Sequence, residues 1–278
     1  MSTATLTYLA GGDDGAIRVK TASRAVGGLE VLVRITHSGV CGTDGHDRVA
    51  GCGLGHEGVG VVEETGKEVT HFKIGQRVGC SWQTSITVFE ALQISGTKAT
   101  DRVGIIGLGG LGHIAVLYAR AMGCDVVVFS GSEKKKADAS ELGASEFHVL
   151  KSGDQSTSDT PANIDVMLIC GGTVSDLTPI MPLLRRRSRI VPLTIQAEPL
   201  IVPYMPLILP GTQIIGSTGA SDENRELALL FAARHQIKPW VEEFPMSADG
   251  LTEALEKLQS GSIRYRAVLS TELGNGLH

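Results

Sequence analysis

Two short segments near the start of the chain carry side chains that bind metal ions. They read Cys41-Gly42-Thr43-Asp44-Gly45-His46 and Gly55-His56-Glu57-Gly58. Cys41 supplies a thiolate and His56 an imidazole, and each has a carboxylate nearby in the sequence to orient it, a combination that suits zinc. A single Cys or His is more often structural, but two such clusters in one short domain favour a zinc site.

A third segment has the spacing of a phosphate-binding turn. Gly107-Leu108-Gly109-Gly110-Leu111-Gly112 follows an apolar stretch and precedes a helix-forming one. In a Gly-x-Gly-x-x-Gly motif the first glycine makes the turn, the second lets the backbone approach a pyrophosphate, and the third lets the helix pack on its strand. The free N–H groups at the helix start then bind the anion. We predict that these six residues bind a dinucleotide.

The elements around this turn support the prediction. Because the chain contains 35 glycines, the motif by itself is a weak signal. It gains weight from its neighbours, since 102–106 is predicted as a strand, 114–122 as a helix and 125–129 as a second strand. This is the βαβ unit that the motif requires.

Three sections follow from the pattern of elements. Residues 1–82 hold short β-rich segments separated by glycines, which predicts a barrel-like domain. Residues 83–236 alternate strands with helices, which predicts an α/β fold built on a doubly wound, Rossmann-type parallel sheet. Residues 237–278 are predicted to form two strands around a helix at 248–260.

Composition excludes several classes of partner. The formal net charge is -5, so we expect no nucleic-acid partner. No apolar run approaches the roughly 18 residues of a membrane span, and the N-terminus lacks a signal-peptide pattern, which predicts a cytoplasmic protein without a membrane partner. The five cysteines, at scattered spacings, favour reduced thiols or a metal ligand over a disulfide framework.

The end of the second predicted strand indicates which cofactor is bound. An NAD site places an acidic residue there for the ribose 2′-hydroxyl, whereas an NADP site has neutral and basic groups. This chain reads Ser130-Gly131-Ser132-Glu133-Lys134-Lys135. Ser130 and Ser132 replace the acid, and Lys134 or Lys135 is placed to pair with a 2′-phosphate. We predict NADP(H), with Glu133 as the one opposing charge, although lysines at a helix start are often simply solvated.

Together these motifs resemble the zinc-dependent medium-chain alcohol dehydrogenases, in particular the yeast alcohol dehydrogenase and cinnamyl alcohol dehydrogenase branch. The likeness extends over nearly the whole chain. It is carried by Gly39-Val40-Cys41-Gly42-Thr43-Asp44, Gly55-His56-Glu57-Gly58-Val59-Gly60, Gly75-Gln76-Arg77-Val78-Gly79, the glycine turn and Ile263-Arg264-Tyr265-Arg266. The resemblance implies that the barrel-like domain is GroES-like.

The resemblance also implies roles for individual residues. Cys41 and His56 match catalytic zinc ligands, and Glu57 matches a neighbouring carboxylate that approaches the metal. Thr43 matches the hydroxyl that passes on the substrate proton and His46 the outer end of that relay, while Asp44 is an orienting partner. The implied chemistry is zinc polarisation of a carbonyl in a small-molecule substrate, with hydride from the nicotinamide. The family commonly forms homodimers or larger homo-oligomers.

The chain departs from the family in one section. After residue 79 the family continues with a lobe of four cysteines that binds a structural zinc, but no Cys-x-x-Cys occurs here, so no structural zinc is expected. Thr87 matches a threonine that touches the nicotinamide, and the family places a third zinc-ligand cysteine four residues before it. That position is Gln83, a poor zinc ligand. Glu57 completes a three-ligand set, or Cys52 or Cys80 substitutes.

Three hypotheses therefore stay open. The leading one is a shortened NADPH-dependent alcohol dehydrogenase or carbonyl reductase with zinc on Cys41, His56 and Glu57. The second is a zinc-free NADPH-dependent reductase of the enoyl or quinone type. The third is a catalytically degenerate NADPH-binding protein that is not an enzyme.

Overall fold

The computed structural model describes residues 3–81, 86–150 and 163–273, and the chain divides into two compact units. The first unit combines residues 1–82 with 240–278, and the second covers 83–239. The second unit therefore ends slightly beyond residue 236, where the alternating pattern was expected to stop. Among the described residues, no helix combines the length and apolar character that a membrane span requires. The cytoplasmic location stays a prediction.

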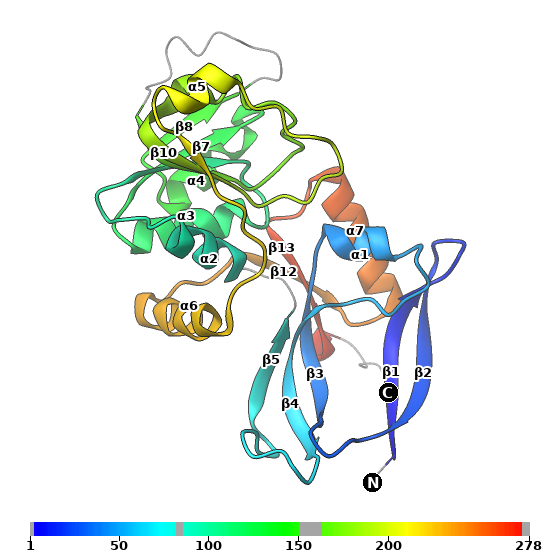
Figure 1. Cartoon of the computed structure of the whole chain (residues 1–278). Coiled ribbons are helices and arrows are strands. Elements are labelled where there is room, and N and C mark those ends of the chain that lie inside the picture. The colour runs from blue at the N-terminus through cyan, green and yellow to red at the C-terminus, as the bar shows by residue number, and fades with distance from the viewer. Residues whose placement is uncertain (1–2, 82–85, 151–162, 274–278) are drawn as a thin grey trace. The chain divides into compact units, whose positions relative to one another are not determined.

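The first unit contains a β-hairpin and a separate five-stranded sheet (Figure 1). The hairpin pairs β1 (Thr3–Gly11) with β2 (Ile17–Ala25). In the sheet, the order is β12-β13-β3-β4-β5. Its strands are β12 (Val241–Pro245), β13 (Arg266–Ser270), β3 (Val31–Val40), β4 (Glu57–Thr65) and β5 (Arg77–Ser81). Only β12 and β13 are parallel neighbours, so a crossover must join them.

That crossover is α7 (Ala248–Ser260), and it closes the core of the first unit. Its start is capped by the Ser247 hydroxyl, which accepts a hydrogen bond from the Gly250 N–H, and Gly261 ends it in the left-handed conformation. Buried apolar side chains of α7 then pack with those of the strands. The core comprises Leu9, Val40, Phe244, Met246, Leu251, Ala254, Leu255, Ile263, Ala267 and Leu269. The short helices are α1 (Gly42–Asp47) and the 3₁₀ turn Thr271–Leu273.

The second unit is a six-stranded parallel sheet in the order β11-β10-β9-β6-β7-β8, which is the doubly wound sheet that the alternating pattern predicts. Its strands are β6 (Arg102–Ile106), β7 (Asp125–Ser130), β8 (Glu146–Val149), β9 (Ile164–Ile169), β10 (Leu184–Pro192) and β11 (Gln213–Ile214). Its α-helices are α2 (Ile86–Ile94), α3 (Gly112–Ala121), α4 (Lys136–Leu142), α5 (Tyr204–Ile208) and α6 (Asp222–His235). Two 3₁₀ turns cover Glu133–Lys135 and Met181–Leu183.

The two central strands of this sheet, β6 and β9, are mostly apolar because both of their faces are covered. Val103, Ile105, Val166 and Leu168 are fully buried in the two central strands, β6 and β9. The order reverses at β6, where the chain crosses to β7 on one side and later to β9 on the other. Ligands of open α/β sheets bind at the carboxyl ends of the strands at such a point, and the glycine turn begins directly after β6.

Candidate functional site

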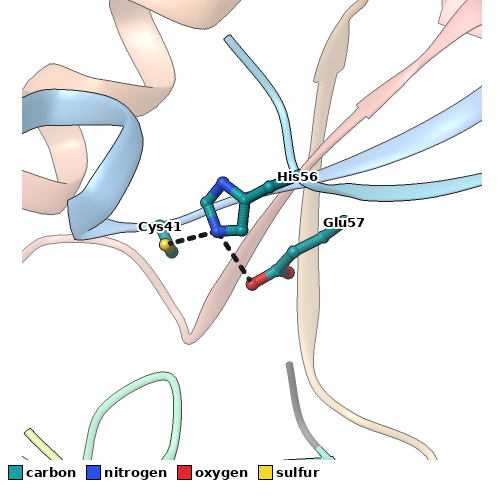
Figure 2. Close-up of side chains that lie close together, drawn as sticks. All are labelled: Cys41, His56 and Glu57. Carbon is teal, nitrogen blue, oxygen red and sulfur yellow. Dashed lines mark hydrogen bonds and ion pairs between the residues drawn. The ribbon is translucent and has the colours of Figure 1, made fainter. Parts of the chain in front are cut away.

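Three side chains of types that ligate metal ions gather in the first unit. Cys41, His56 and Glu57 each offer one donor atom, and these atoms lie within 4.8 Å of one another. Figure 2 shows the Cys41 Sγ and one Glu57 oxygen on either side of the same His56 nitrogen. The His56 Nε2 lies 3.2 Å from Cys41 Sγ and 3.8 Å from Glu57 Oε1.

The strand pairing brings these residues together. β3 and β4 are antiparallel, with Ser38 opposite Gly58, so the end of β3 meets the start of β4. Cys41 directly follows β3, and Glu57 is the first residue of β4. Cys41 is also the N-cap of α1, because its Sγ accepts a hydrogen bond from the Thr43 N–H at 3.4 Å.

Asp44 is the residue that fixes the geometry of this group. Its side chain is almost completely buried, and Oδ2 accepts a hydrogen bond from the Cys41 N–H at 2.9 Å, while Oδ1 accepts one from the Gly55 N–H at 3.0 Å. Oδ1 also lies 3.4 Å from His56 Nδ1, the ring nitrogen that does not face Cys41. Asp44 therefore orients the imidazole as outer carboxylates do in metal sites.

The surroundings of Cys41 favour its protonated form while no cation is bound. Burial raises the pKa of the Cys41 thiol; hydrogen bonds from Thr43 oppose this, and the nearby charges of Glu57 and Asp44 add to it. A bound cation would reverse the balance, since metal ligands of this kind are thiolates. The nearby charges of Glu57 and Asp44 are the part of this balance that a bound cation would offset.

The two members of the predicted proton relay differ in exposure. Both lie on α1, where Thr43 is half-buried beside Cys41 and His46 is exposed. No hydrogen bond joins them within the described part of the chain. The alternative ligands Cys52 and Cys80 are exposed, and neither belongs to the cluster of Cys41, His56 and Glu57 found among the described residues. Gln83 lies outside the described residues.

An apolar cavity of about 540 Å³ lies on the Asp44 side of the group in the first unit. Its walls include His56 and Asp44 but not Cys41 or Glu57. The apolar residues that line it are Leu9, Ile35, Val40, Leu54, Met246, Leu251 and Leu269.

In the second unit, the three glycines of the turn differ in the space that their surroundings would leave for a Cβ atom. Gly107 has a φ of +89°, and a Cβ there would lie 2.8 Å from the Gly171 nitrogen. A Cβ on Gly112 would lie only 1.9 Å from the Gly107 carbonyl oxygen. At Gly109, by contrast, a Cβ would meet nothing within 4 Å. Gly107 and Gly112 are therefore required by the fold, and Gly109 leaves open space in front of the turn.

The residues expected to recognise the 2′-phosphate lie at the end of β7. Ser130 is the last residue of the strand, Ser132 precedes the 3₁₀ turn, and Lys134 is exposed. Lys135 is half-buried, and its Nζ donates a hydrogen bond to the Leu108 carbonyl oxygen at 2.7 Å. Burial lowers the pKa of Lys135. Lys135 thus supports the glycine turn, a contact that its sequence position did not indicate. Thr87, also in this unit, is buried in α2.

One charged residue of the first unit was given no role by sequence reasoning. Arg266, at the start of β13, forms an ion pair with Glu57 Oε2. The motif that contains Arg266 contributed to the family resemblance. Arg266 and Glu57 are 209 residues apart in the sequence, however, so no local sequence pattern indicates that they meet. Only the sheet order, with β13 and β4 on either side of β3, predicts it.

Comparison with known protein families identifies the class. The family model described as the alcohol dehydrogenase GroES-like domain matches residues 27–125, and the one described as zinc-binding dehydrogenase matches residues 110–234. Mannitol dehydrogenase from Petroselinum crispum is 30% identical over 330 aligned residues, covering 90% of this chain and 96% of the relative. The chain therefore belongs to the zinc-type medium-chain alcohol dehydrogenase family, which confirms the resemblance and the predicted fold class.

Other relatives agree with this assignment. The NADP-dependent alcohol dehydrogenase C 1 of Mycolicibacterium smegmatis is 29% identical, covering 89% of this chain and 92% of the relative. A solved cinnamyl alcohol dehydrogenase from Sorghum bicolor shares the fold with a TM-score of 0.89 at 24% identity, covering 100% of this chain and 99% of that one. A cinnamyl alcohol dehydrogenase from Helicobacter pylori, complexed with NADP(H), has a TM-score of 0.85 at 23% identity, covering 98% and 99%.

These comparisons also bear on the shortened section. The alignment with mannitol dehydrogenase has 330 positions, whereas the whole chain has 278 residues. The relative therefore carries residues within the matched range that this chain lacks, as the sequence motifs predict.

Proposed function

We propose that this protein is an NADPH-dependent alcohol dehydrogenase and carbonyl reductase with a zinc ion held by Cys41, His56 and Glu57. The convergence of these three donor atoms within 4.8 Å carries the proposal. A thiolate, an imidazole and a carboxylate are ligands that zinc takes in catalytic sites, where three protein ligands leave one position open. The buried Asp44 beside His56 supplies the outer partner that such sites have.

Several features support NADPH as the cofactor. The open space at Gly109 lies at the glycine that must allow a pyrophosphate to approach. Ser130 and Ser132 replace the acidic residue of an NAD site, and Lys134 is exposed next to them. The relative from M. smegmatis is named as NADP-dependent.

Individual residues of this chain would have distinct roles in the proposed reaction. Zinc, when bound, would polarise the carbonyl oxygen of a small aldehyde or ketone, and NADPH would supply the hydride. Asp44 orients His56, and the backbone N–H of Thr43 supports the Cys41 sulfur. The Thr43 hydroxyl would hand on the substrate proton. His46, being exposed, would exchange that proton with solvent.

The test measures zinc and cofactor separately. We expect about one zinc per chain in the purified protein and none in Cys41→Ser, while Cys80→Ser, which alters an exposed thiol of the same unit, keeps the metal. NADPH binding and NADPH oxidation with a panel of aldehydes then show the activity. Zinc-independent turnover restricted to α,β-unsaturated carbonyls would establish the reductase alternative instead. Absence of both zinc and NADPH binding would remove the proposal.

We also propose that the protein forms a homo-oligomer through the second unit. The support is apolar surface at one edge of the sheet, where Tyr204, Met205 and Leu209 are more than half exposed and Ile208 and Ile214 are partly so. Monomeric proteins seldom leave such residues together in water. Light scattering should give a dimer or larger assembly, and Leu209→Glu should dissociate it; a wild-type monomer would contradict the proposal.

A further inference from the structure

The Glu57 carboxylate contacts both the candidate metal ligand His56 and a positively charged side chain, Arg266. The Glu57 Oε1 lies toward His56, and Oε2 forms an ion pair with the Arg266 guanidinium. The two side chains are only 9% and 13% exposed. Solvent therefore screens this pair weakly, and the Arg266 charge acts on the metal group with much of its strength.

Gly39 shows that the fold makes room for this pair. It lies on β3, the strand between those that carry Glu57 and Arg266. A Cβ on Gly39 would lie 2.2 Å from Glu57 Oε2 and 3.1 Å from Arg266 Nη2. Its backbone does not adopt a positive φ, so conformational freedom does not explain the glycine. The space taken by the ion pair does.

Two effects of Arg266 on metal binding oppose each other. A partner on Oε2 orients the carboxylate, which favours binding, but a positive charge so close to a divalent cation repels it and draws charge from the ligand. Orientation depends less on Arg266, because Glu57 is already held in β4 between β3 and β5, opposite Ser81. Among the described residues, no other group takes over the effect of the Arg266 charge on the cation. We therefore expect the repulsion by Arg266 to outweigh its effect on the orientation of Glu57.

We propose, on the basis of the zinc site in the proposed function, that Arg266 competes with the metal ion for Glu57 and weakens metal binding to the Cys41, His56 and Glu57 group. Glu57 is then a ligand through one oxygen only. Arg266 acts through Glu57 and is a positioning residue.

The experiment compares zinc dissociation constants of the full chain, measured by competition with a chromophoric chelator. Arg266→Gln removes the positive charge that repels the cation, and zinc should bind roughly tenfold more tightly. Arg266→Lys keeps the charge and should stay near the wild type. The matched control is Arg34→Gln, which breaks the exposed pair between Arg34 and Glu63 in the same sheet and should change nothing.

Unchanged or weaker zinc binding by Arg266→Gln would overturn the inference while leaving the zinc site intact. Tighter binding by Arg266→Lys to the same degree would also overturn it, because the charge would then be irrelevant. A wild type without zinc binding would remove both the inference and the metal in the proposed function. Because an unpaired buried carboxylate destabilises the metal-free fold, the zinc-dependent rise in melting temperature is measured as well. It should be larger for Arg266→Gln than for the wild type, and an equal or smaller rise counts against the competition.

Discussion

Asp44 Oδ1 lies 3.4 Å from His56 Nδ1, while the other nitrogen of the same ring lies 3.2 Å from Cys41 Sγ. The imidazole is therefore held between a buried carboxylate and the metal group. Asp44→Asn keeps the shape of the side chain but removes its charge. Zinc affinity should fall about 10- to 100-fold, because outer carboxylates fix the orientation of a ligand and raise its basicity.

The control for this variant is Asp47→Asn on the same helix, α1. Among the described residues, the Asp47 side chain forms no hydrogen bond or ion pair with Cys41, His56 or Glu57, in contrast to Asp44, so the zinc affinity of the Asp47→Asn variant should match that of the wild type. Equal zinc affinity of Asp44→Asn and the wild type would show that Asp44 has only a structural role.

Two alanine substitutions in the glycine turn should separate the effects on stability and on cofactor binding. Gly112→Ala places a methyl group 1.9 Å from the Gly107 carbonyl oxygen, so the free energy of unfolding should fall by roughly 1–3 kcal/mol or more. Gly109→Ala meets nothing within 4 Å and should change stability by less than about 0.5 kcal/mol. Its methyl group occupies the space expected for the pyrophosphate, so NADPH should bind more weakly.

Denaturant unfolding and NADPH fluorescence titration check this pair. Undiminished NADPH affinity in Gly109→Ala would show that the dinucleotide does not lie against the turn.

Lys134 and Lys135 should differ in their effect on cofactor preference. Lys134 is exposed, so Lys134→Ala should weaken NADPH binding by roughly tenfold through loss of a charge partner for the 2′-phosphate and leave NADH binding unchanged. The Lys135 Nζ donates to the Leu108 carbonyl oxygen, so Lys135→Ala should loosen the turn and weaken both cofactors together.

The measurement is the ratio of the NADPH and NADH dissociation constants for each variant. A ratio that Lys134→Ala leaves at the wild-type value would place 2′-phosphate recognition on other residues.

Cys170 provides a pH dependence of stability. Burial raises the pKa of this thiol to about 12 from its usual 9.0. The folded chain thus keeps a proton that the unfolded chain loses, so this contribution to stability is complete below about pH 9 and declines as the pH rises from about 9 toward about 12.

Comparison with Cys170→Ala separates this thiol from the other groups that titrate at high pH. The difference in unfolding free energy between the wild type and Cys170→Ala should narrow as the pH is raised above about 9. A difference that stays constant with pH would show that the thiol titrates normally.

The sequence by itself determined the features that depend on neighbours along the chain. The strand, glycine turn and helix at 102–122 follow from local periodicity and from the steric needs of Gly107 and Gly112. Cys41 and His56 were identifiable because their residue types and flanking carboxylates suit a metal. The family motifs then supplied Glu57 as the third candidate.

Only the tertiary structure decided which side chains meet across the sheets. The ion pair between Arg266 and Glu57 depends on β13 and β4 lying on either side of β3, and the sequence does not encode that order locally. The bond from Lys135 to Leu108 likewise depends on how the end of β7 packs against the turn after β6. The physical reason is that ion pairs and hydrogen bonds act over a few ångströms in space, whereas sequence patterns report spacing along the chain.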